Sequence, residues 1–245
     1  LLLLVSLTCA RSFAMGINRY FDREIDAKNP RTANRAIPAH KLTPQSSLFW
    51  TLSFAALFVL STLGYNRTTF LCSVPVLIIL ALYPLTKKFT WLCHFYLGFC
   101  LSLSPVAAHV ALGVGFHWLS ITIGAAVLFW VCGFDIIYAT QDINFDSKEK
   151  IYSIPATFGI KNALLISQFC FLVMLILLFS IGWFEKLGLF YWIGLTVIGS
   201  ILFWEHYSLK KMDSYEKINP IFFTANAWVS VIFFCFCSLE KLISI

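Results

Sequence analysis

Eight apolar stretches dominate this sequence, and most of them are long enough to cross a lipid bilayer. A membrane-spanning helix needs about 20 mostly apolar residues, whereas a barrel strand needs only about 10. The stretches cover residues 1–21, 44–65, 69–83, 90–112, 117–140, 162–183, 187–206 and 219–239. Their length therefore predicts an all-α fold, a polytopic membrane helix bundle that forms a single domain over residues 1–245.

The composition excludes the other main classes of protein. Only 12% of the 245 residues are charged and 59% are hydrophobic, whereas a soluble domain has about 25% charged residues. The chain is too apolar for a disordered protein and too long and apolar for a secreted disulfide scaffold. The sequence begins inside an apolar run without a methionine, so we expect an N-terminal helix to be missing.

Basic residues are distributed unevenly between the connections. Fourteen of the eighteen lysines and arginines lie in one alternating set of connections, within residues 19–41, 87–88, 148–161 and 210–217. The positive-inside rule places this set in the cytoplasm. The net charge of +6 is therefore explained by membrane topology, and we expect no nucleic-acid partner.

A pair of aspartates closes the first apolar stretch. Asp22 and Asp26 are one helical turn apart, and Arg11 and Asn18 lie on the same helical stripe. Two carboxylates this close repel each other unless a cation lies between them. Carboxylate and amide oxygens suit Mg²⁺, which also accepts phosphate oxygens as ligands.

A second pair repeats this spacing after the fifth stretch. Asp142 and Asp146 are four residues apart, and Asp135 and Tyr138 precede them on the same stripe. Two matching pairs at one membrane face predict two pseudo-twofold halves with a site between them, holding two Mg²⁺ ions and a diphosphate. Basic and aromatic candidates for contacting this ligand are Arg31, Arg35, Tyr83, Lys87 and Lys148.

These motifs resemble those of a known family. The segment NRYFDREID at residues 18–26, with residues 10–12 and 31–35, resembles the first aspartate motif of the UbiA superfamily of intramembrane prenyltransferases. Residues 135–146 resemble the second aspartate motif, and residues 83–92 are similar to the tyrosine–lysine segment. The resemblance implies a nine-helix bundle, of which eight spans are visible here. It also implies Mg²⁺-dependent transfer of an isoprenoid chain from its diphosphate to an acceptor.

The resemblance also implies roles for individual residues. Lys87 and Arg35 would neutralise the diphosphate, Arg11 would bind an acceptor carboxylate, and Tyr138 and Asp135 would line the acceptor end. Asp135 and Asp142 are both candidates for the base that removes the ring proton. The ligands of Mg²⁺ and diphosphate would be Asn18, Asp22, Asp26, Asp142 and Asp146.

The acceptor is less strongly specified than the reaction. Arg19, Ala36 and His40 stand where many members have Asp, Pro and Gly. The Asn18–Arg19 pair together with the segment NPRT at residues 29–32 is similar to a 4-hydroxybenzoate polyprenyltransferase-like subgroup. We expect transfer of a polyprenyl group to an aromatic acceptor, 4-hydroxybenzoate, in ubiquinone-type quinone biosynthesis. The alternatives are a menaquinone-pathway aromatic and, more remotely, a membrane transporter. We expect the bacterial inner membrane as the location, with the active site facing the cytoplasm.

Overall fold

The computed structural model describes residues 1–209 and 220–243, and the side chains among them except those of 220–223. Throughout this part the regular structure is helical. The elements are α1 (Leu2–Lys28), α2 (Pro44–Thr62), α3 (Arg67–Thr86), α4 (Cys93–Ala111), α5 (Trp118–Ala139), the short 3₁₀ turn η1 (Thr140–Asp142), α6 (Ile143–Glu149), α7 (Ile154–Phe184), α8 (Leu189–Leu209) and α9 (Pro220–Ile243).

The all-α prediction is confirmed, and each of the eight apolar stretches coincides largely with one long helix. Seven of these helices are long and apolar enough to cross a membrane, so the chain is an integral membrane protein. The helix outside this set is α1, which is 27 residues long and carries the polar residues of the first aspartate motif. The basic residues expected at 210–217 lie outside the described residues.

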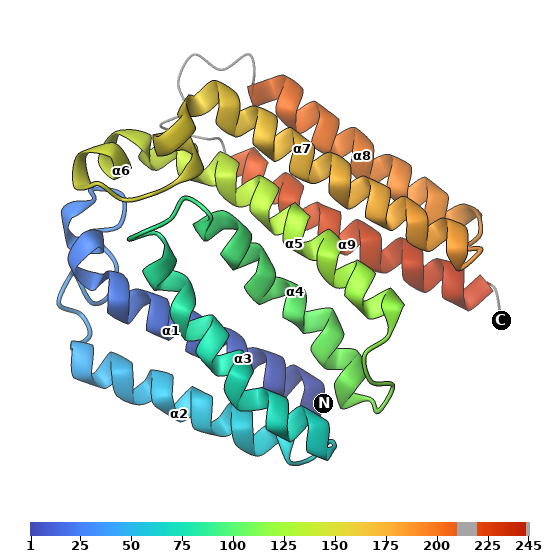
Figure 1. Ribbon diagram of the computed structural model, residues 1–245, viewed down its shortest axis with the longest axis horizontal. Coiled ribbons are helices and arrows are strands. Elements are labelled where there is room, and N and C mark those ends of the chain that lie inside the picture. Colours follow the sequence, from blue (N-terminus) through green and yellow to red (C-terminus); the bar gives the residue numbers. More distant parts are fainter. Residues whose placement is uncertain (210–219, 244–245) are drawn as a thin grey trace.

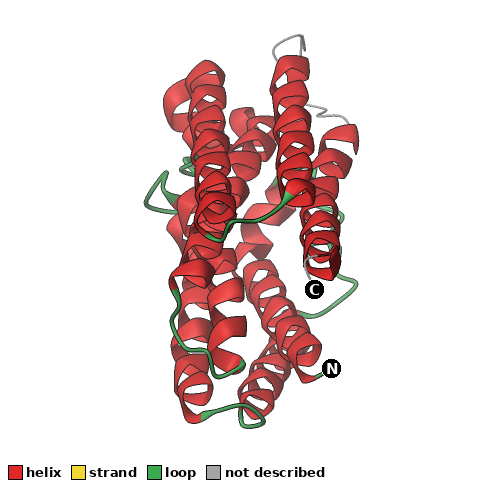
Figure 2. Cartoon of the chain, turned by 90° about the vertical axis from the view of Figure 1, so that its right-hand side faces the viewer, coloured by secondary structure: helices red, strands yellow, loops and turns green. Residues whose placement is uncertain are grey.

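The helices form two groups joined through the middle of the bundle (Figure 1). Helices α1 to α4 lie in one group, and α7, α8 and α9 lie in the other. Helix α5 contacts α4 on one side and α7 on the other, and α1 contacts α2 and α3. The side view shows that the long helices run roughly along a common direction (Figure 2). The sites that follow α1, α3 and α5 therefore lie at one end of the bundle.

Close backbone contact holds the central helices together. A Cβ atom on Gly98 of α4 would lie 2.4 Å from the carbonyl oxygen of Leu128 in α5, so only glycine fits there. On the other side of α5, the Ser167 hydroxyl of α7 donates to the Gly133 carbonyl oxygen at 2.8 Å. Small residues and interhelical hydrogen bonds are the usual basis of helix association in lipid. They fix α5, which leads into the second aspartate motif.

Helix α7 begins earlier than the apolar stretch at 162–183 predicted, because a short helical segment precedes a kink. The Ser153 side chain caps the segment by accepting from the Ala156 amide at 3.3 Å. Gly159 then has φ +77° and ψ 163°, a backbone conformation outside the helix. A residue without Cβ is required in this region of backbone space.

Candidate active site

The first aspartate pair lies on the last turns of α1, and each carboxylate is paired with a basic side chain. Asp22 is 2% exposed. Its Oδ2 accepts a hydrogen bond at 2.5 Å from Nζ of Lys87, the residue that follows α3. Asp26 accepts from Arg35 Nη1 at 2.6 and 2.7 Å to its two oxygens. Arg35 reaches it because the loop after α1 folds back, with the Thr32 hydroxyl donating to the Asp26 carbonyl oxygen at 3.0 Å.

The second motif is held by the loop that follows the first. Asp142 Oδ1 accepts from Asn29 Nδ2 at 3.0 Å and from Arg31 Nε at 2.9 Å. Arg31 Nη2 also donates to Asp142 Oδ2, and Arg31 Nη1 donates to the Tyr138 hydroxyl. The guanidinium lies 4.9 Å from the centre of the Tyr138 ring, a cation–π distance.

The environment of Arg31 stabilises its positive charge. Partial burial lowers the Arg31 pKa, but hydrogen bonding to Asp142 and the charge of that carboxylate outweigh the burial and raise the pKa above its usual value. Arg31 is therefore cationic at every physiological pH.

The two motifs have equal spacing but different local structure. The first pair lies on an uninterrupted α-helix, whereas Asp142 ends the 3₁₀ turn η1 and Asp146 lies on the separate helix α6. The prediction of one continuous stripe from Asp135 to Asp146 is therefore wrong, because the chain turns after α5.

Further contacts join the motifs across the end of the bundle. Lys28 Nζ donates to Glu149 Oε2 at 2.7 Å, and the Tyr152 amide donates to the Lys87 carbonyl oxygen at 2.8 Å. The structure thus brings together the ends of α1, α3 and α5, which are far apart in the sequence.

The oxygen-rich side chains fit a divalent cation by their chemistry. Asp22 Oδ1 is buried and has no hydrogen-bond partner, and a buried acceptor left unpaired costs about 1–3 kcal/mol. A cation would satisfy it. Among the described residues, no three His, Cys, Asp or Glu side chains converge on one point. Asp22, Asp26 and Asp142 are paired with basic residues.

Other predicted site residues make fewer contacts. Arg11 and Lys148 are exposed and form no hydrogen bond or ion pair with the described part of the chain. Asn18 and Tyr83 are half-buried, and Asp146 is buried. The structure therefore places Arg11 and Lys148 in no contact with the aspartates.

Two contributors were not predicted as site residues. Asn29 contacts Asp142 as described above, and His94 Nδ1 lies 2.7 Å from Asp135 Oδ2. Asn29 stands two residues before Arg31 in the sequence, so its nearness to the residues of the first motif was the available signal. His94 is 41 residues from Asp135 and lies in an apolar stretch, so the sequence offered no signal for it.

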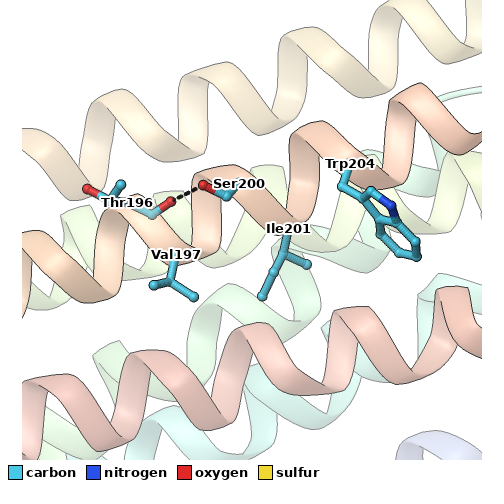
Figure 3. Close-up of a pocket in the computed structure, with 5 residues that line it drawn as sticks. All are labelled: Thr196, Val197, Ser200, Ile201 and Trp204. Carbon is cyan, nitrogen blue, oxygen red and sulfur yellow. Dashed lines mark hydrogen bonds between the residues drawn. The ribbon is translucent and has the colours of Figure 1, made fainter.

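A separate recess lies on the outer part of α8 (Figure 3). It has a volume of about 300 Å³ and is lined by Thr196, Val197, Ser200, Ile201 and Trp204. None of these side chains is charged, and the Ser200 hydroxyl donates a hydrogen bond to the Thr196 carbonyl oxygen at 2.9 Å. The recess has none of the chemistry of the aspartate site.

The fold and the site together define a membrane-embedded enzyme with an acidic and basic cluster at one end of its helices. The model of the UbiA prenyltransferase family matches residues 1–229, and the chain belongs to this family. It is therefore a transferase of the prenyltransferase class.

Curated relatives support this assignment. The chain is 30% identical to a protein from Tolumonas auensis named 4-hydroxybenzoate octaprenyltransferase, over 91% of this chain and 77% of that one. It is 29% identical to 4-hydroxybenzoate geranyltransferase 2 of Lithospermum erythrorhizon, over 89% of this chain and 71% of that one. The two names share an acceptor and differ in the length of the prenyl group.

Solved structures share the fold. The apo structure of a UbiA homologue from Aeropyrum pernix matches with a TM-score of 0.86 and 25% identity, covering 98% of this chain and 88% of that one. A UbiA homologue from Archaeoglobus fulgidus, described as bound to GPP and Mg²⁺, matches with a TM-score of 0.69 and 21% identity over 100% and 87% of the two chains. The second likeness is evidence for the fold alone.

Proposed function

We propose that this protein transfers a polyprenyl group from a polyprenyl diphosphate to 4-hydroxybenzoate, in ubiquinone-type quinone biosynthesis. The observation that carries the proposal is the meeting of two aspartate pairs at one end of the bundle, with basic side chains on Asp22, Asp26 and Asp142. The names of the curated relatives support the acceptor. Residues 1–245 act as one domain, in a bacterial inner membrane with the site facing the cytoplasm.

Mg²⁺ would be held by Asn18, Asp22, Asp26, Asp142 and Asp146, and it would neutralise the charge that develops on the leaving diphosphate. Homologues described as bound to Mg²⁺ support this choice of ion. Lys87, Arg35 and Arg31 are the cationic side chains available for the phosphate oxygens. Because the aspartates pair with these cations in the structure, substrate binding exchanges one set of charge pairs for another. The exchange leaves no buried charge unpaired, which would be costly.

The reaction breaks the C–O bond of the allylic diphosphate, and the bonding electrons leave with the diphosphate. A carbon of the acceptor ring forms the new C–C bond to the allylic carbon, and the proton on that ring carbon leaves to a carboxylate. Positive side chains close to the leaving group favour this charge separation. The apolar helices exclude water, which would otherwise capture the allylic cation.

Arg11 is the residue we assign to the acceptor carboxylate. Its guanidinium is exposed and makes no ion pair with the described chain, so it is available to a ligand. It lies on the stripe of α1 that carries Asn18, Asp22 and Asp26. A planar guanidinium matches a carboxylate with two parallel hydrogen bonds. Tyr83, Tyr138 and Asp135 are assigned to the acceptor end, and Lys148 to the phosphate side.

Prenyl transfer by membranes containing the protein tests the proposal. Mg²⁺ and a polyprenyl diphosphate are supplied with 4-hydroxybenzoate or a menaquinone-pathway aromatic, and the products are read by mass spectrometry. We expect Mg²⁺-dependent prenylation of 4-hydroxybenzoate. Product on the menaquinone-pathway aromatic alone would replace the acceptor, and no product on any acceptor would contradict the proposed activity.

Two variants test the site itself. Asp22→Asn and Asp142→Asn each remove a negative charge at nearly constant shape, so we expect both to abolish transfer while the protein stays folded. Glu24→Gln is the matched control, since Glu24 is exposed and contacts only Arg23 in the described chain. Substantial activity in either aspartate variant at equal expression would contradict the proposed Mg²⁺ site.

A further inference from the structure

A histidine and an aspartate form a buried pair outside the two aspartate motifs. His94 is the second residue of α4, and Asp135 lies near the end of α5, seven residues before Asp142. His94 Nδ1 lies 2.7 Å from Asp135 Oδ2. The histidine side chain is 4% exposed, and the aspartate side chain is 20% exposed. Asp135 is therefore reachable by a ligand, and His94 is not.

The contacts of His94 determine which of its nitrogens carries hydrogen. The backbone amide of Ile154 donates to His94 Nε2 at 3.2 Å. An amide can only donate, so Nε2 must be the acceptor and carry no hydrogen. In a neutral imidazole the hydrogen is then on Nδ1, which donates it to Asp135 Oδ2. The histidine is thus a fixed donor to the carboxylate.

The Ile154 amide also makes the position of the ring well defined. Ile154 is the first residue of α7 and is completely buried, and amides in a first helical turn lack partners inside their own helix. His94 supplies one of these missing acceptors. The ring is therefore clamped between α5 and α7, and it cannot turn without leaving two buried groups unpaired.

The hydrogen bonds distinguish the two carboxylates that are candidates for the base. Both oxygens of Asp142 already accept hydrogen bonds, from Asn29 and Arg31. Asp135 uses only Oδ2, and no described residue donates to its Oδ1. Within the described chain, Asp135 therefore has a free carboxylate oxygen, and Asp142 does not.

We propose that His94 is a positioning residue that holds Asp135 so that Oδ1 receives the proton lost by the acceptor ring. The ring C–H bond breaks, its electrons return to the aromatic system, and the proton passes to Oδ1. This inference rests on the proposed function for its substrate. The contact between His94 and Asp135 itself does not.

Two isosteric replacements separate the two hydrogen bonds of His94. In His94→Asn the amide nitrogen occupies a place close to that of Nδ1, so it retains a donor for Asp135 and loses contact with Ile154. In His94→Gln the amide oxygen reaches the place of Nε2, so it retains an acceptor for Ile154 and loses the donor to Asp135. Each variant removes one bond, and the two side chains are chemically alike.

We expect His94→Gln to lower the kcat of prenyl transfer by about 10-fold to 100-fold, the usual effect of losing an orienting partner. His94→Asn should keep kcat within a few-fold of the wild-type value. Neither should change the KM for polyprenyl diphosphate. A merely structural histidine would give equal losses in both variants, and that result, or full activity of His94→Gln, would overturn the proposal.

A spectroscopic measurement tests the pair without activity. The chain has five histidines, and ¹⁵N-histidine NMR of the detergent-solubilised protein assigns His94 as the signal absent from His94→Gln. We expect Nδ1 to be protonated, Nε2 to be unprotonated, and both signals to shift in Asp135→Asn. An Nε2-protonated ring would overturn the proposal. The expected spectrum in a protein that prenylates no acceptor would instead contradict only the proposed function.

Discussion

At the scale of single residues, the site is organised by charge pairs that the sequence alone does not specify. Asp22 is almost fully buried at the end of α1, and Lys87 is its only hydrogen-bond partner among the described residues. Removing the lysine would leave both carboxylate oxygens without a donor. A buried carboxylate without a partner is strongly disfavoured. Lys87 therefore stabilises the folded site, in addition to the phosphate contact proposed for it.

Lys87 and its neighbour provide a matched comparison. We expect Lys87→Met to lower kcat for prenyl transfer by about 10²-fold to 10³-fold, the effect of losing one charge-stabilising donor. Lys88→Met should have little effect, because Lys88 is exposed and forms no hydrogen bond or ion pair with described residues. Steady-state rates at equal amounts of folded protein provide the measurement. Equal effects of the two substitutions would show that only the overall positive charge of this end matters.

The residues of the aspartate motifs could be predicted because helical spacing alone puts Asp22 and Asp26 on one face. The partners could not be predicted in the same way. Arg35 pairs with Asp26 of the first motif, whereas Arg31 pairs with Asp142 of the second. This pairing depends on how the loop after α1 turns. His94 of α4 reaches Asp135 of α5 across the packed interface between these two helices. Such contacts come from tertiary structure.

At the scale of elements, apolar length predicted the helices well and their interruptions poorly. The long helices agree with the apolar stretches because a run of about 20 apolar residues has few alternatives in a bilayer. The 3₁₀ turn after α5 and the kink in α7 cannot be predicted from the hydropathy of the sequence. Both depend on local backbone conformation, and Gly159 is where that conformation requires a particular residue.

Gly159 therefore gives a prediction about stability. Nothing lies within 4 Å of a Cβ atom built on this residue, so any cost of Gly159→Ala comes from φ +77° and not from a clash. We expect the substitution to lower stability by about 1–3 kcal/mol, seen as a lower midpoint of thermal unfolding in detergent.

Gly199 is the control for this substitution. It lies within α8, where an added Cβ would make only an ordinary contact with Leu175 at 3.9 Å. Alanine is favoured over glycine in a helix by about 1 kcal/mol, so Gly199→Ala should leave the midpoint unchanged or raise it. A Gly159→Ala protein as stable as the wild type would show that the kink is not a fixed feature of α7.

At the scale of the whole molecule, ion pairs join the aspartates to basic residues of the connections that follow α1 and α3, so both lie at the same end of the bundle. The positive-inside rule assigns that end to the cytoplasm. The diphosphate group of a substrate on the cytoplasmic side would enter the site there without crossing the bilayer. The orientation is thus a prediction that both the charge distribution and the proposed substrate support.

Single-cysteine labelling tests this orientation. The eight native cysteines are first replaced by serine or alanine, and prenyl transfer confirms that the protein remains folded. Lys41→Cys then marks the exposed loop beside the aspartates, and Val114→Cys marks the exposed loop between α4 and α5 at the opposite end. A maleimide that cannot cross membranes should label position 41 only in inside-out vesicles and position 114 only in right-side-out vesicles.

Because both positions are exposed, weak labelling cannot be explained by burial. The reverse labelling pattern would place the site on the outer face. That result would require the diphosphate to be supplied from outside the cytoplasm, although the contacts among the aspartates and basic residues would be unchanged.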